Sequence, residues 1–428
     1  MALRSAAGES RRSVGSPDED VTGSVHFPVH PFAASSGATV AAYARTVRRL
    51  LTLVSSIIFV DAMLFTALTP LLPSYAEEFD LSKAGAGVLV GAFGVGSMLG
   101  GVPGGIIAAR YGPKRAVVAG LVLLGIASFA FAAADSASTL AAARFVQGLS
   151  STTTWAGALA WIAVVAPRNR RGQTLGIAFG AAVFGAVLGP MFGGVAELVG
   201  IRTSFAIVGA LTLVFAAFAA LPTDAPGEPL TTRGLRRALR DPRFIGGLWL
   251  NTLPALLFGM LVVLAPLALD DDGWSTLQIA SVFFAAGLLE VVINPLLGRA
   301  SDLRGRLLPI RAALSASVVV AGALAFAGHS LAIALLVGAA TVSFGACYTP
   351  GMALASDRAE AAGLAQGIAF GLMNTAWALG EATGPSLGGT LAEAADDTLP
   401  YLLGAGLCAL TLLATWQVAA QRVRPRAA

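Results

Sequence analysis

Long apolar segments alternate with short polar ones along most of this chain. From Leu50 onward, twelve segments are each long enough to cross the roughly 30 Å hydrocarbon core of a bilayer as a helix. The predicted spans are 50–74, 84–108, 115–134, 139–166, 173–197, 202–221, 244–269, 276–299, 307–327, 331–355, 364–392 and 399–420. The pattern therefore predicts an all-α integral membrane protein with twelve transmembrane helices.

The longest polar interruption divides these spans into six and six. It covers residues 222–243 and contains four prolines and several arginines. We predict a disordered cytoplasmic tail at 1–47, a six-helix bundle at 48–221, a cytoplasmic linker at 222–243, a second six-helix bundle at 244–420 and a cytoplasmic tail at 421–428.

Two spans carry the same glycine–proline motif. The first copy is Gly185, Gly189, Pro190, Gly193 and Gly194, and the second is Gly380, Gly384, Pro385, Gly388 and Gly389, each position being 195 residues further on. In lipid, glycine lets two helix backbones approach closely, and proline is tolerated because neighbouring helices satisfy the freed carbonyl. The duplication indicates two related halves, each with a bent helix at a tight seam, which is a plan typical of transporters.

A second repeat has an offset of 193 residues. Gly105, Ala109 and Gly112 follow the second span with the same spacing as Gly298, Asp302 and Gly305 after the eighth. This offset supports the division into halves.

Composition excludes several classes of protein. Hydrophobic residues are 56% of the chain and charged residues 12%, about half of the roughly 25% charged residues of soluble domains. The two cysteines lie in apolar runs, so we expect no disulfide framework, and we expect no metal and no cofactor. The three histidines lie outside the spans, so proton chemistry within the membrane must use carboxylates.

The basic residues give the protein an orientation. Of the 28 Lys and Arg, only Lys83 and Arg202 fall in loops on the side opposite the tails, and Arg144 lies within a span. By the positive-inside rule, both termini are cytoplasmic. The charge distribution is explained by the lipid bilayer, so we expect no nucleic-acid partner.

Several of these motifs together resemble the major facilitator superfamily, and within it the twelve-span drug:proton antiporters. Gly105 to Arg115, with Arg110, Gly112 and Lys114, resembles the family's loop motif; Arg144-Phe-Val-Gln147-Gly148 resembles its fourth-span motif; Gly185 to Gly194 resembles its antiporter motif; and the first span from Asp61 to Pro73 is similar to that of multidrug and tetracycline exporters and vesicular amine transporters. The resemblance implies two six-helix bundles related by pseudo-two-fold symmetry around a central cavity, alternating access and a monomer.

One departure from the loop motif affects the expected gating. The family has an aspartate where this chain has Ala109, and the resemblance implies that this carboxylate clamps the cytoplasmic side in one conformation. Here the clamp must be weaker, or Asp302 in the second copy must supply it.

Four charged residues fall well inside the predicted spans: Asp61, Arg144, Glu290 and Glu381. Each needs a reason, because a charge near the bilayer centre costs about 2.5–3.5 kcal/mol on insertion scales. Asp61 is a candidate site for a proton or a substrate cation, the alternative being a structural pair with Arg144 or a polar helix contact. Glu381 replaces the Ala186 of the first motif copy, an asymmetry that packing alone does not require.

The other two charges also have two readings each. The resemblance implies that Arg144 biases the protonation of a nearby acid, while a lone arginine near a helix end can also snorkel to the interface. Glu290 either binds substrate in the cavity or pairs with an arginine such as Arg299.

Uncharged polar and aromatic residues complete the set of candidates for the cavity. They are Gln147, Asn251, Asn294, Asn374, Trp155 and Trp377. Amides bridge helices in membranes, and aromatic walls suit flat cationic or lipophilic molecules. Core packing explains each single tryptophan equally well.

These observations predict a proton-coupled antiporter of a bacterial inner membrane. It would export a lipophilic small molecule, cationic or not, such as an antibiotic, driven by the proton gradient and without a bound cofactor. A proton symporter that imports a nutrient has the same fold, and a non-transporting membrane regulator is a further alternative. An enzyme is disfavoured, because the spans contain no histidine and no nucleophile–base pair.

Overall fold

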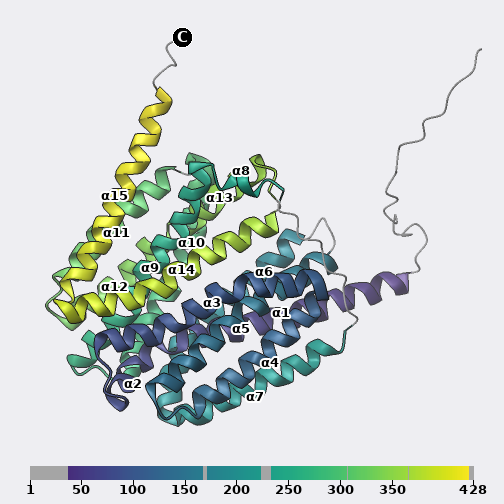
Figure 1. The fold of residues 1–428 in the computed structure, drawn as a ribbon, viewed down its shortest axis with the longest axis horizontal. Helices are drawn as coiled ribbons and strands as arrows, with labels where there is room; N and C mark the ends of the chain where they lie inside the picture. Colours follow the sequence, from purple (N-terminus) through teal and green to yellow (C-terminus); the bar gives the residue numbers. More distant parts are fainter. Residues whose placement is uncertain (1–36, 167–170, 223–232, 306, 365, 424–428) are drawn as a thin grey trace, which may run out of the picture. The chain divides into compact units, whose positions relative to one another are not determined.

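The computed structural model of the protein describes residues 37–166, 171–222, 233–305, 307–364 and 366–423. Residues Val47–Ala428 make one compact unit, whereas Met1–Thr46 are separate from it and are described only from Gly37, where the first helix begins. Every element of the described residues is a helix (Figure 1).

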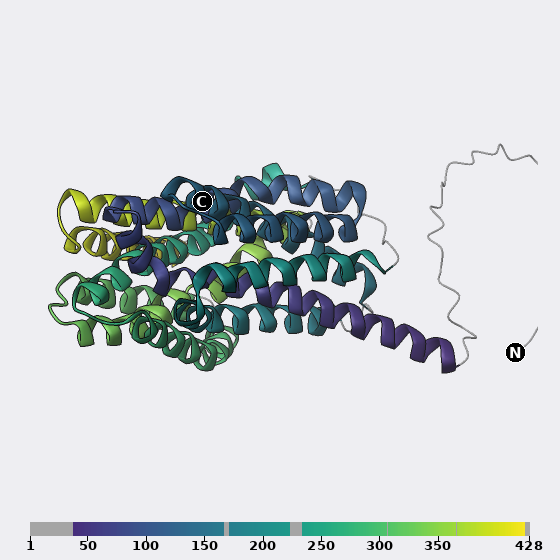
Figure 2. The ribbon, with the colours of Figure 1, turned by 90° about the horizontal axis from the view of Figure 1, so that it is seen from below.

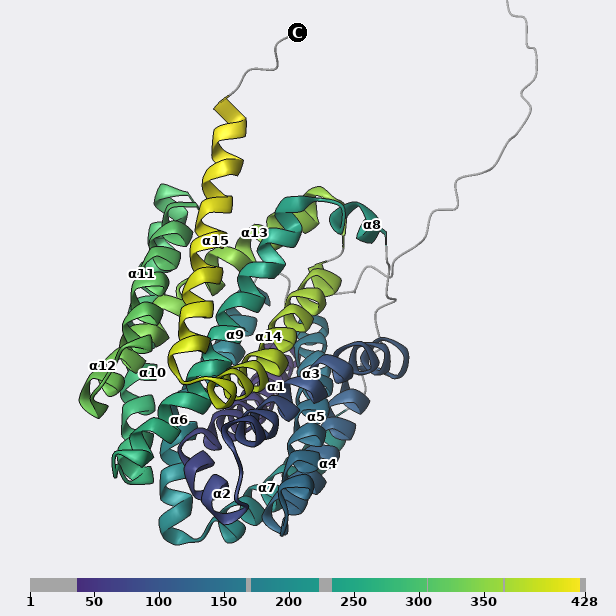
Figure 3. The ribbon, with the colours of Figure 1, turned by 60° about the vertical axis from the view of Figure 1, so that its left-hand side comes forward.

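The helices of the N-terminal bundle are α1 (Gly37–Ala67), the short 3₁₀ helix η1 (Thr69–Leu71), α2 (Leu72–Glu78), α3 (Lys83–Tyr111), α4 (Pro113–Ala132), α5 (Ala137–Val165), α6 (Arg171–Val199) and α7 (Ile201–Ala220). A short helix, α8 (Leu235–Ala238), follows. The C-terminal bundle contains α9 (Pro242–Asp271), α10 (Thr276–Arg304), α11 (Leu307–Ala325), α12 (Ser330–Gly345), α13 (Tyr348–Ala361), α14 (Gln366–Ala394) and α15 (Thr398–Val423). Figures 1 and 3 show the two groups of long helices, with α14 beside α3.

These elements make the twelve crossings that the hydropathy predicts. The first crossing is α1 continued by η1 and α2, with Pro70 and Pro73 at the breaks, and the tenth is α12 continued by α13. Two boundaries differ from the prediction. The first helix begins at Gly37, so residues 37–47 are helical and not a disordered tail (Figure 2, purple). The short helix α8 forms within the predicted linker (Figure 1).

Ten of the described helices are long and apolar enough to cross a membrane by composition alone. The remaining two crossings, α5 and α14, have 29 residues each and carry more polar side chains. Both pack against α3, and they pack against α4 and α9 respectively, so neighbouring helices cover much of their surface. A helix shielded in this way can carry polar residues that lipid would reject.

The two glycine–proline segments pack in equivalent ways. Cβ atoms built on Gly185 and Gly189 of α6 would overlap backbone carbonyls of Phe59 and Met63 in α1. Cβ atoms built on Gly380 and Gly384 of α14 would overlap the carbonyls of Thr252 and Leu256 in α9, and these partners lie 193 residues after Phe59 and Met63. The repeat in sequence is therefore a repeat in packing, with α6 on α1 and α14 on α9.

Each proline interrupts the hydrogen bonding of an otherwise continuous helix. Pro190 has no N–H for the carbonyl of Ala186, and the Thr66 hydroxyl of α1 donates to that carbonyl at 2.8 Å. In the second half, the position that matches Thr66 at an offset of 193 residues is Gly259, which lies against the ring of Pro385. The first copy thus has a hydroxyl that satisfies the freed carbonyl, whereas the second has a glycine that lets the helices pack closely at the same place.

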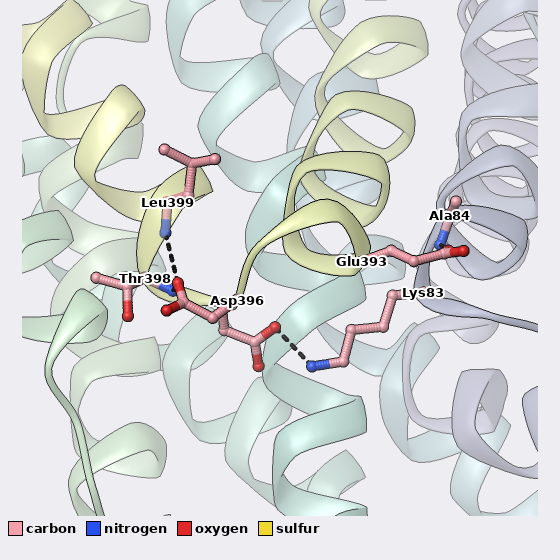
Figure 4. A network of polar contacts seen from close by, with 7 residues as sticks. Lys83, Ala84, Glu393, Asp396, Thr398 and Leu399 are labelled. Carbon is pink, nitrogen blue, oxygen red and sulfur yellow. Dashed lines mark hydrogen bonds and ion pairs between the residues drawn. The ribbon is translucent and has the colours of Figure 1, made fainter.

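The two bundles meet at the end that holds residues 79–82, 272–275 and 395–397, called here the odd-loop end. Cβ atoms built on Gly87, Gly91 and Gly94 of α3 would clash with α14, and one on Gly194 of α6 would lie 2.8 Å from Ala280 of α10. Figure 4 shows the polar contacts beside the α3–α14 seam: Lys83 pairs with Asp397 at 2.6 Å.

At the opposite end, called the linker end, the same helices separate. Among the described residues, nothing lies within 4 Å of a Cβ built on Gly105 of α3, Gly371 of α14 or Gly180 of α6. The two bundles are therefore closely packed at the odd-loop end, whereas the described residues show no such packing around these three glycines at the linker end.

Candidate substrate cavity

A cavity of about 430 Å³ lies between the two bundles. Its walls come from helices of both halves, and most of its lining residues are apolar or aromatic. The lining residues are Ala62, Phe65, Thr66, Leu68, Thr69, Val90, Arg144, Ala182, Val183, Ala186, Val187, Pro190, Phe258, Val262, Phe283, Gly287, Glu290, Thr341, Tyr348, Trp377 and Glu381. Three of the four intramembrane charges predicted from the sequence thus share one cavity.

The lining follows the internal repeat. Three pairs of lining residues are related by the 193-residue offset: Phe65 with Phe258, Thr69 with Val262 and Val90 with Phe283. Two further pairs are related by 195 residues, but in these Ala182 and Ala186 of α6 correspond to Trp377 and Glu381 of α14. Matched positions of the two halves therefore line the cavity, but the side chains at some of these positions differ in size and charge.

Arg144 of α5 lines this cavity and is 2% exposed, so it does not snorkel to the interface. Its guanidinium donates to the Gln147 side chain at 3.1 Å and to the carbonyl of Phe65 at 3.3 Å, and it stacks over the Phe93 ring at 4.7 Å. The Nε atom has no hydrogen-bond partner among the described residues. Arg144 is therefore fixed by its own bundle with its charge at the cavity wall.

Glu381 of α14 lines the same cavity as Arg144 but belongs to the other bundle. Its side chain is 4% exposed. A Cβ on Gly94 of α3 would lie 2.5 Å from the backbone carbon of Glu381, so the α3–α14 seam sets the position of this residue. Residues of opposite charge from the two halves thus line one cavity.

Asp61 of α1 lies behind the cavity wall. One of its oxygens, Oδ2, accepts hydrogen bonds from the Ser151 hydroxyl at 2.7 Å and from the Trp155 indole at 2.8 Å. The side chain is 4% exposed, while its neighbour Ala62 lines the cavity. Asp61 therefore makes a polar contact within the N-terminal bundle, and its hydrogen bonds come from α5 residues other than Arg144.

Glu290 of α10 lines the part of the cavity formed by the C-terminal bundle. Its Oε1 atom would lie 2.5 Å from a Cβ built on Gly345 of α12, so the missing side chain at Gly345 makes room for the carboxylate. Tyr348, Thr341 and Phe258 line the same part of the wall.

The uncharged candidates fall into different environments. Trp377 lines the cavity and packs edge-on against Phe65 of the other bundle, with ring centroids 5.5 Å apart. Gln147 and Asn251 are buried outside the lining, Asn251 donating to the carbonyl of Gly247 in its own helix. Asn374 is exposed and does not line this cavity, and the side chain of Asn294 lies outside the described residues.

The loop motifs at the linker end share a backbone conformation. Gly112 and Gly305 have φ of 93° and 77°, which favours glycine at both positions. Lys114 donates to the carbonyl of Pro222 at 2.7 Å, and the Arg110 guanidinium lies over the Tyr111 ring. The Asp302 side chain and the surroundings of Gly298 lie outside the described residues, so the substitute clamp at Asp302 stays a prediction.

The sequence analysis did not single out several residues of this site. Phe65, Phe258, Phe283 and Val90 could have been found by applying the 193-residue offset to the first and seventh and to the second and eighth spans. Ser151 belongs to a run of five hydroxyl residues within an apolar span, which is itself a signal of a buried polar partner. Tyr348 lies 193 residues after Trp155, a cavity candidate of the sequence analysis, whereas Thr341 had no such signal.

The family comparison agrees with the fold and the motifs. The model of the Major Facilitator Superfamily matches residues 54–370. The chain belongs to the major facilitator superfamily. This membership makes it an integral, multi-pass membrane transporter.

Two relatives within the superfamily are similar to this chain. It is 24% identical over 351 residues to "Multidrug resistance protein 2" of Bacillus subtilis (strain 168), covering 78% of this chain and 86% of that one. It is 31% identical over 145 residues to "Quinolone resistance protein NorA" of Staphylococcus aureus (strain MRSA252), covering 34% of this chain and 37% of that one.

Two solved structures share its fold at low sequence identity. One is a bacterial homolog of the human lysosomal transporter Spinster in an inward-facing and occupied conformation, with TM-score 0.69, 17% identity and coverage of 92% of this chain and 100% of that one. The other is a D-xylose–proton symporter, with TM-score 0.67, 17% identity and coverage of 87% and 97%.

Proposed function

We propose that this superfamily member is a proton-coupled antiporter that exports a lipophilic small molecule, cationic or neutral, by alternating access. The observation that carries the proposal is the cavity itself: apolar and aromatic walls around Arg144, Glu290 and Glu381. Apolar walls favour lipophilic substrates, and intramembrane carboxylates can exchange protons or bind cations. The names of two relatives, a multidrug resistance protein and a quinolone resistance protein, support the same substrate class.

The Arg144–Glu381 pair offers a way to couple the two fluxes. Both residues line the cavity from opposite bundles, so Arg144 would attract a deprotonated Glu381, and a proton on Glu381 would remove that attraction. Antiport requires that proton binding and substrate binding exclude each other. A substrate that occupies the cavity next to Glu381 would favour release of its proton, and a proton would favour release of the substrate.

Asp61 is the second candidate for proton transfer. It lies one residue from the cavity wall, and its carboxylate accepts two hydrogen bonds from α5, the helix that carries Arg144. Protonation at Asp61 would weaken these bonds and free α1 to move against α5. We propose that Asp61 responds to the cavity through the shared helix and not by touching substrate.

We propose a bacterial inner membrane as the location, with both termini and the linker on the cytoplasmic side, and a monomer as the working unit. The basic residues support this orientation. In that orientation the linker end faces the cytoplasm and the closely packed odd-loop end faces outward. Single-cysteine labelling at Asp271, in a background lacking Cys347 and Cys408, would test it, because labelling only after permeabilisation contradicts it.

Reconstituted vesicles with a preset proton gradient test the transport proposal. A panel of cationic and neutral lipophilic compounds is added to vesicles that are acidic inside, and the loss of the gradient is read with a pH-sensitive dye. We expect substrates to accumulate inside as protons leave. Flux of substrate and protons in the same direction would replace antiport by symport, and flux that ignores the gradient would remove proton coupling.

A further inference from the structure

The segment 233–243, which leads into α9, carries a dense group of arginines. It contains five arginines and one acid, Asp241, which is already paired with an arginine of α13 at 2.6 Å. Arg236, Arg237 and Arg240 are exposed, and none of the hydrogen bonds and ion pairs among the described residues involves their side chains. Three positive charges on and beside α8 are therefore available to a partner.

The protein holds α8 firmly against the C-terminal bundle. Ala238 is fully buried in an apolar cluster with residues of α9, α13 and α14, and Leu235 packs against that cluster. Gly234 precedes the helix with φ of 84°, and a Cβ there would lie 2.6 Å from the carbonyl oxygen of Ala362. The exposed arginines thus belong to a packed element, and its backbone is fixed relative to the bundle.

A contact between two membrane-spanning helices gives the depth of α8. α9 and α15 run in opposite directions, and the Trp249 indole of α9 donates to the Thr411 hydroxyl of α15 at 2.9 Å. Five residues further along α15 is Trp416, and five residues back along α9 is Phe244, so these two lie at about the same depth. Trp416 is 57% exposed and has the Arg311 guanidinium over its ring at 3.9 Å, as is typical of a membrane–water interface. The chain just before α9, α8 included, therefore lies at the surface of the bilayer.

Exposed apolar side chains accompany these arginines. Leu239 is 44% exposed and Ile245 is 43% exposed. Arginines interleaved with exposed aliphatic side chains are typical of segments that lie on a membrane, where the arginines meet phosphates and the aliphatic groups meet the acyl boundary. A soluble phosphate compound would contact the arginines alone, so this combination favours a lipid.

We propose that α8 is a docking site for the headgroup of an anionic phospholipid, with Arg236, Arg237 and Arg240 binding its phosphate. The planar guanidinium suits this task, because it can donate two parallel hydrogen bonds to phosphate oxygens. The site is separate from the cavity, so it does not depend on proton coupling or on the direction of transport. Because α8 packs with α13 and α14, a bound lipid holds the linker end of the C-terminal bundle at the membrane surface.

Native mass spectrometry of the purified full-length protein in detergent tests this proposal. The probe is phosphatidylglycerol, and phosphatidylcholine with the same acyl chains is the zwitterionic comparison. Wild-type protein should bind phosphatidylglycerol more tightly, and the triple variant Arg236→Gln, Arg237→Gln, Arg240→Gln should weaken that binding about tenfold or more. Binding of phosphatidylcholine should change less than about twofold, because its headgroup has no net charge.

Single substitutions separate a site from general attraction to positive charge. Arg240→Gln should weaken phosphatidylglycerol binding about fivefold. The matched control Arg202→Gln also removes one exposed arginine, but from the odd-loop end, and it should have no effect. The triple variant Arg236→Lys, Arg237→Lys, Arg240→Lys keeps the charge and should keep part of the binding.

The acyl chains provide a second test. Leu239→Ser should weaken binding of the lipid, and glycerophosphoglycerol, the same headgroup without acyl chains, should not compete at concentrations that saturate the site with lipid. Complete competition by the soluble headgroup would replace the lipid by a soluble phosphate compound and overturn the proposal.

Three other results would also overturn it. They are equal binding of the two lipids by the wild type, unchanged binding in the folded triple glutamine variant, and equal losses in Arg240→Gln and Arg202→Gln. Elution volume and thermal unfolding show that each variant is folded, and Arg240→Gln carries the test if the triple variant is not.

Discussion

The glycine–proline segments of α6 and α14 pack in the same way, but only α14 places a tryptophan and a charged residue at the cavity. In both copies, glycines lie on backbone carbonyls of the partner helix, α1 or α9, at positions related by 193 residues. The side chains that line the cavity then differ, with Ala182 and Ala186 in one copy and Trp377 and Glu381 in the other. The two segments therefore share one mode of backbone packing, and only the α14 segment carries a charged residue at the cavity.

The two contacts between the bundles, α3 with α14 and α10 with α6, also differ from each other. On one side, a Cβ on Gly94 of α3 would lie 2.7 Å from the Cα of Ala382 in α14. On the other side, a Cβ on Gly287 of α10 would lie 3.0 Å from a side-chain methyl of Val187 in α6. These residues correspond under the two offsets, so the seam that carries Glu381 is the tighter one. A tight seam holds the acid in a fixed position relative to Arg144.

Substitutions in the scaffold should have the largest effect. Gly384→Val and Gly189→Val both introduce a side chain where the partner's backbone lies, and each should cost about 1–3 kcal/mol or more of stability. Gly384→Val should be the more severe, because α14 also packs against α3. Yield and thermal unfolding in detergent measure this.

A matched control for the scaffold prediction lies in the same helices. Gly180→Val and Gly371→Val are placed where a Cβ has no neighbour within 4 Å among the described residues. They should be far milder than the motif variants. If all four variants lose stability equally, close helix packing is not the role of the motif glycines.

The seams can be compared directly. Gly94→Ala should open the odd-loop end by changing the closed-to-open ratio about tenfold, whereas Gly287→Ala should change it much less, because a side-chain methyl can move aside. Distances between spin labels at Glu78 and Asp396 report the two populations. Equal shifts in the two variants would show that the seams do not differ in strength.

A smaller shift in the same direction should follow from a charge at the linker end. Ala109→Asp restores the carboxylate of the family's loop motif, and an acid that faces the N-terminus of another helix contributes roughly 0.3–1 kcal/mol. We expect a shift of up to about fivefold toward the form closed at the linker end. The same label pair should then show longer distances, and an unchanged distribution would remove the clamp as an explanation of gating.

The smallest change in stability is expected at the N-terminus of α9. This helix start differs from the matched position in the N-terminal half. Asp241 caps α9 by accepting from the Arg243 N–H at 2.9 Å, and it pairs with Arg358 of α13 at 2.6 Å, whereas α1 continues through the matched position. Partial burial raises the pKa of Asp241, but the Arg243 N–H and the Arg358 guanidinium outweigh it and leave this pKa below its ordinary value.

The sign of the pH dependence follows from that lowered pKa. The stabilisation by Asp241 is fully present above the unfolded-state pKa and is lost as the pH falls through the lower folded-state pKa. Asp241→Asn should therefore cost about 1 kcal/mol at neutral pH, and the difference from wild type should vanish in acid. A stability difference that stays constant into strong acid would contradict the pairing.

Much of this architecture could be predicted from the sequence, because bilayer thickness fixes helix length and the glycine repeat fixes the pairing of helices. The breaks at Thr69 and between α12 and α13 were not predicted, since the residues next to each break, such as Leu68 and Leu71 or Ala346 and Cys347, are as apolar as the spans around them. The four intramembrane charges were visible as exceptions to the hydropathy.

The surroundings of these four charged residues could not be predicted from the hydropathy. The pattern cannot tell which face of a helix meets the cavity, so Asp61 behind the wall and Glu290 within it were equivalent in sequence. Only the packing of α1 against α5 shows that Ser151 and Trp155 hold Asp61. The same holds for Gln147 and Asn251, whose burial outside the lining depends on helix rotation.

The central claim is that a carboxylate present in only one of the two copies couples transport to protons. Proton-driven substrate uptake by vesicles containing Glu381→Gln, compared with wild type at equal protein content, tests it most directly. We expect the variant to remain folded and to keep gradient-independent exchange while losing its response to the pH gradient, and Asp61→Asn provides the parallel test in the other half. Full gradient-driven transport by Glu381→Gln would contradict the account.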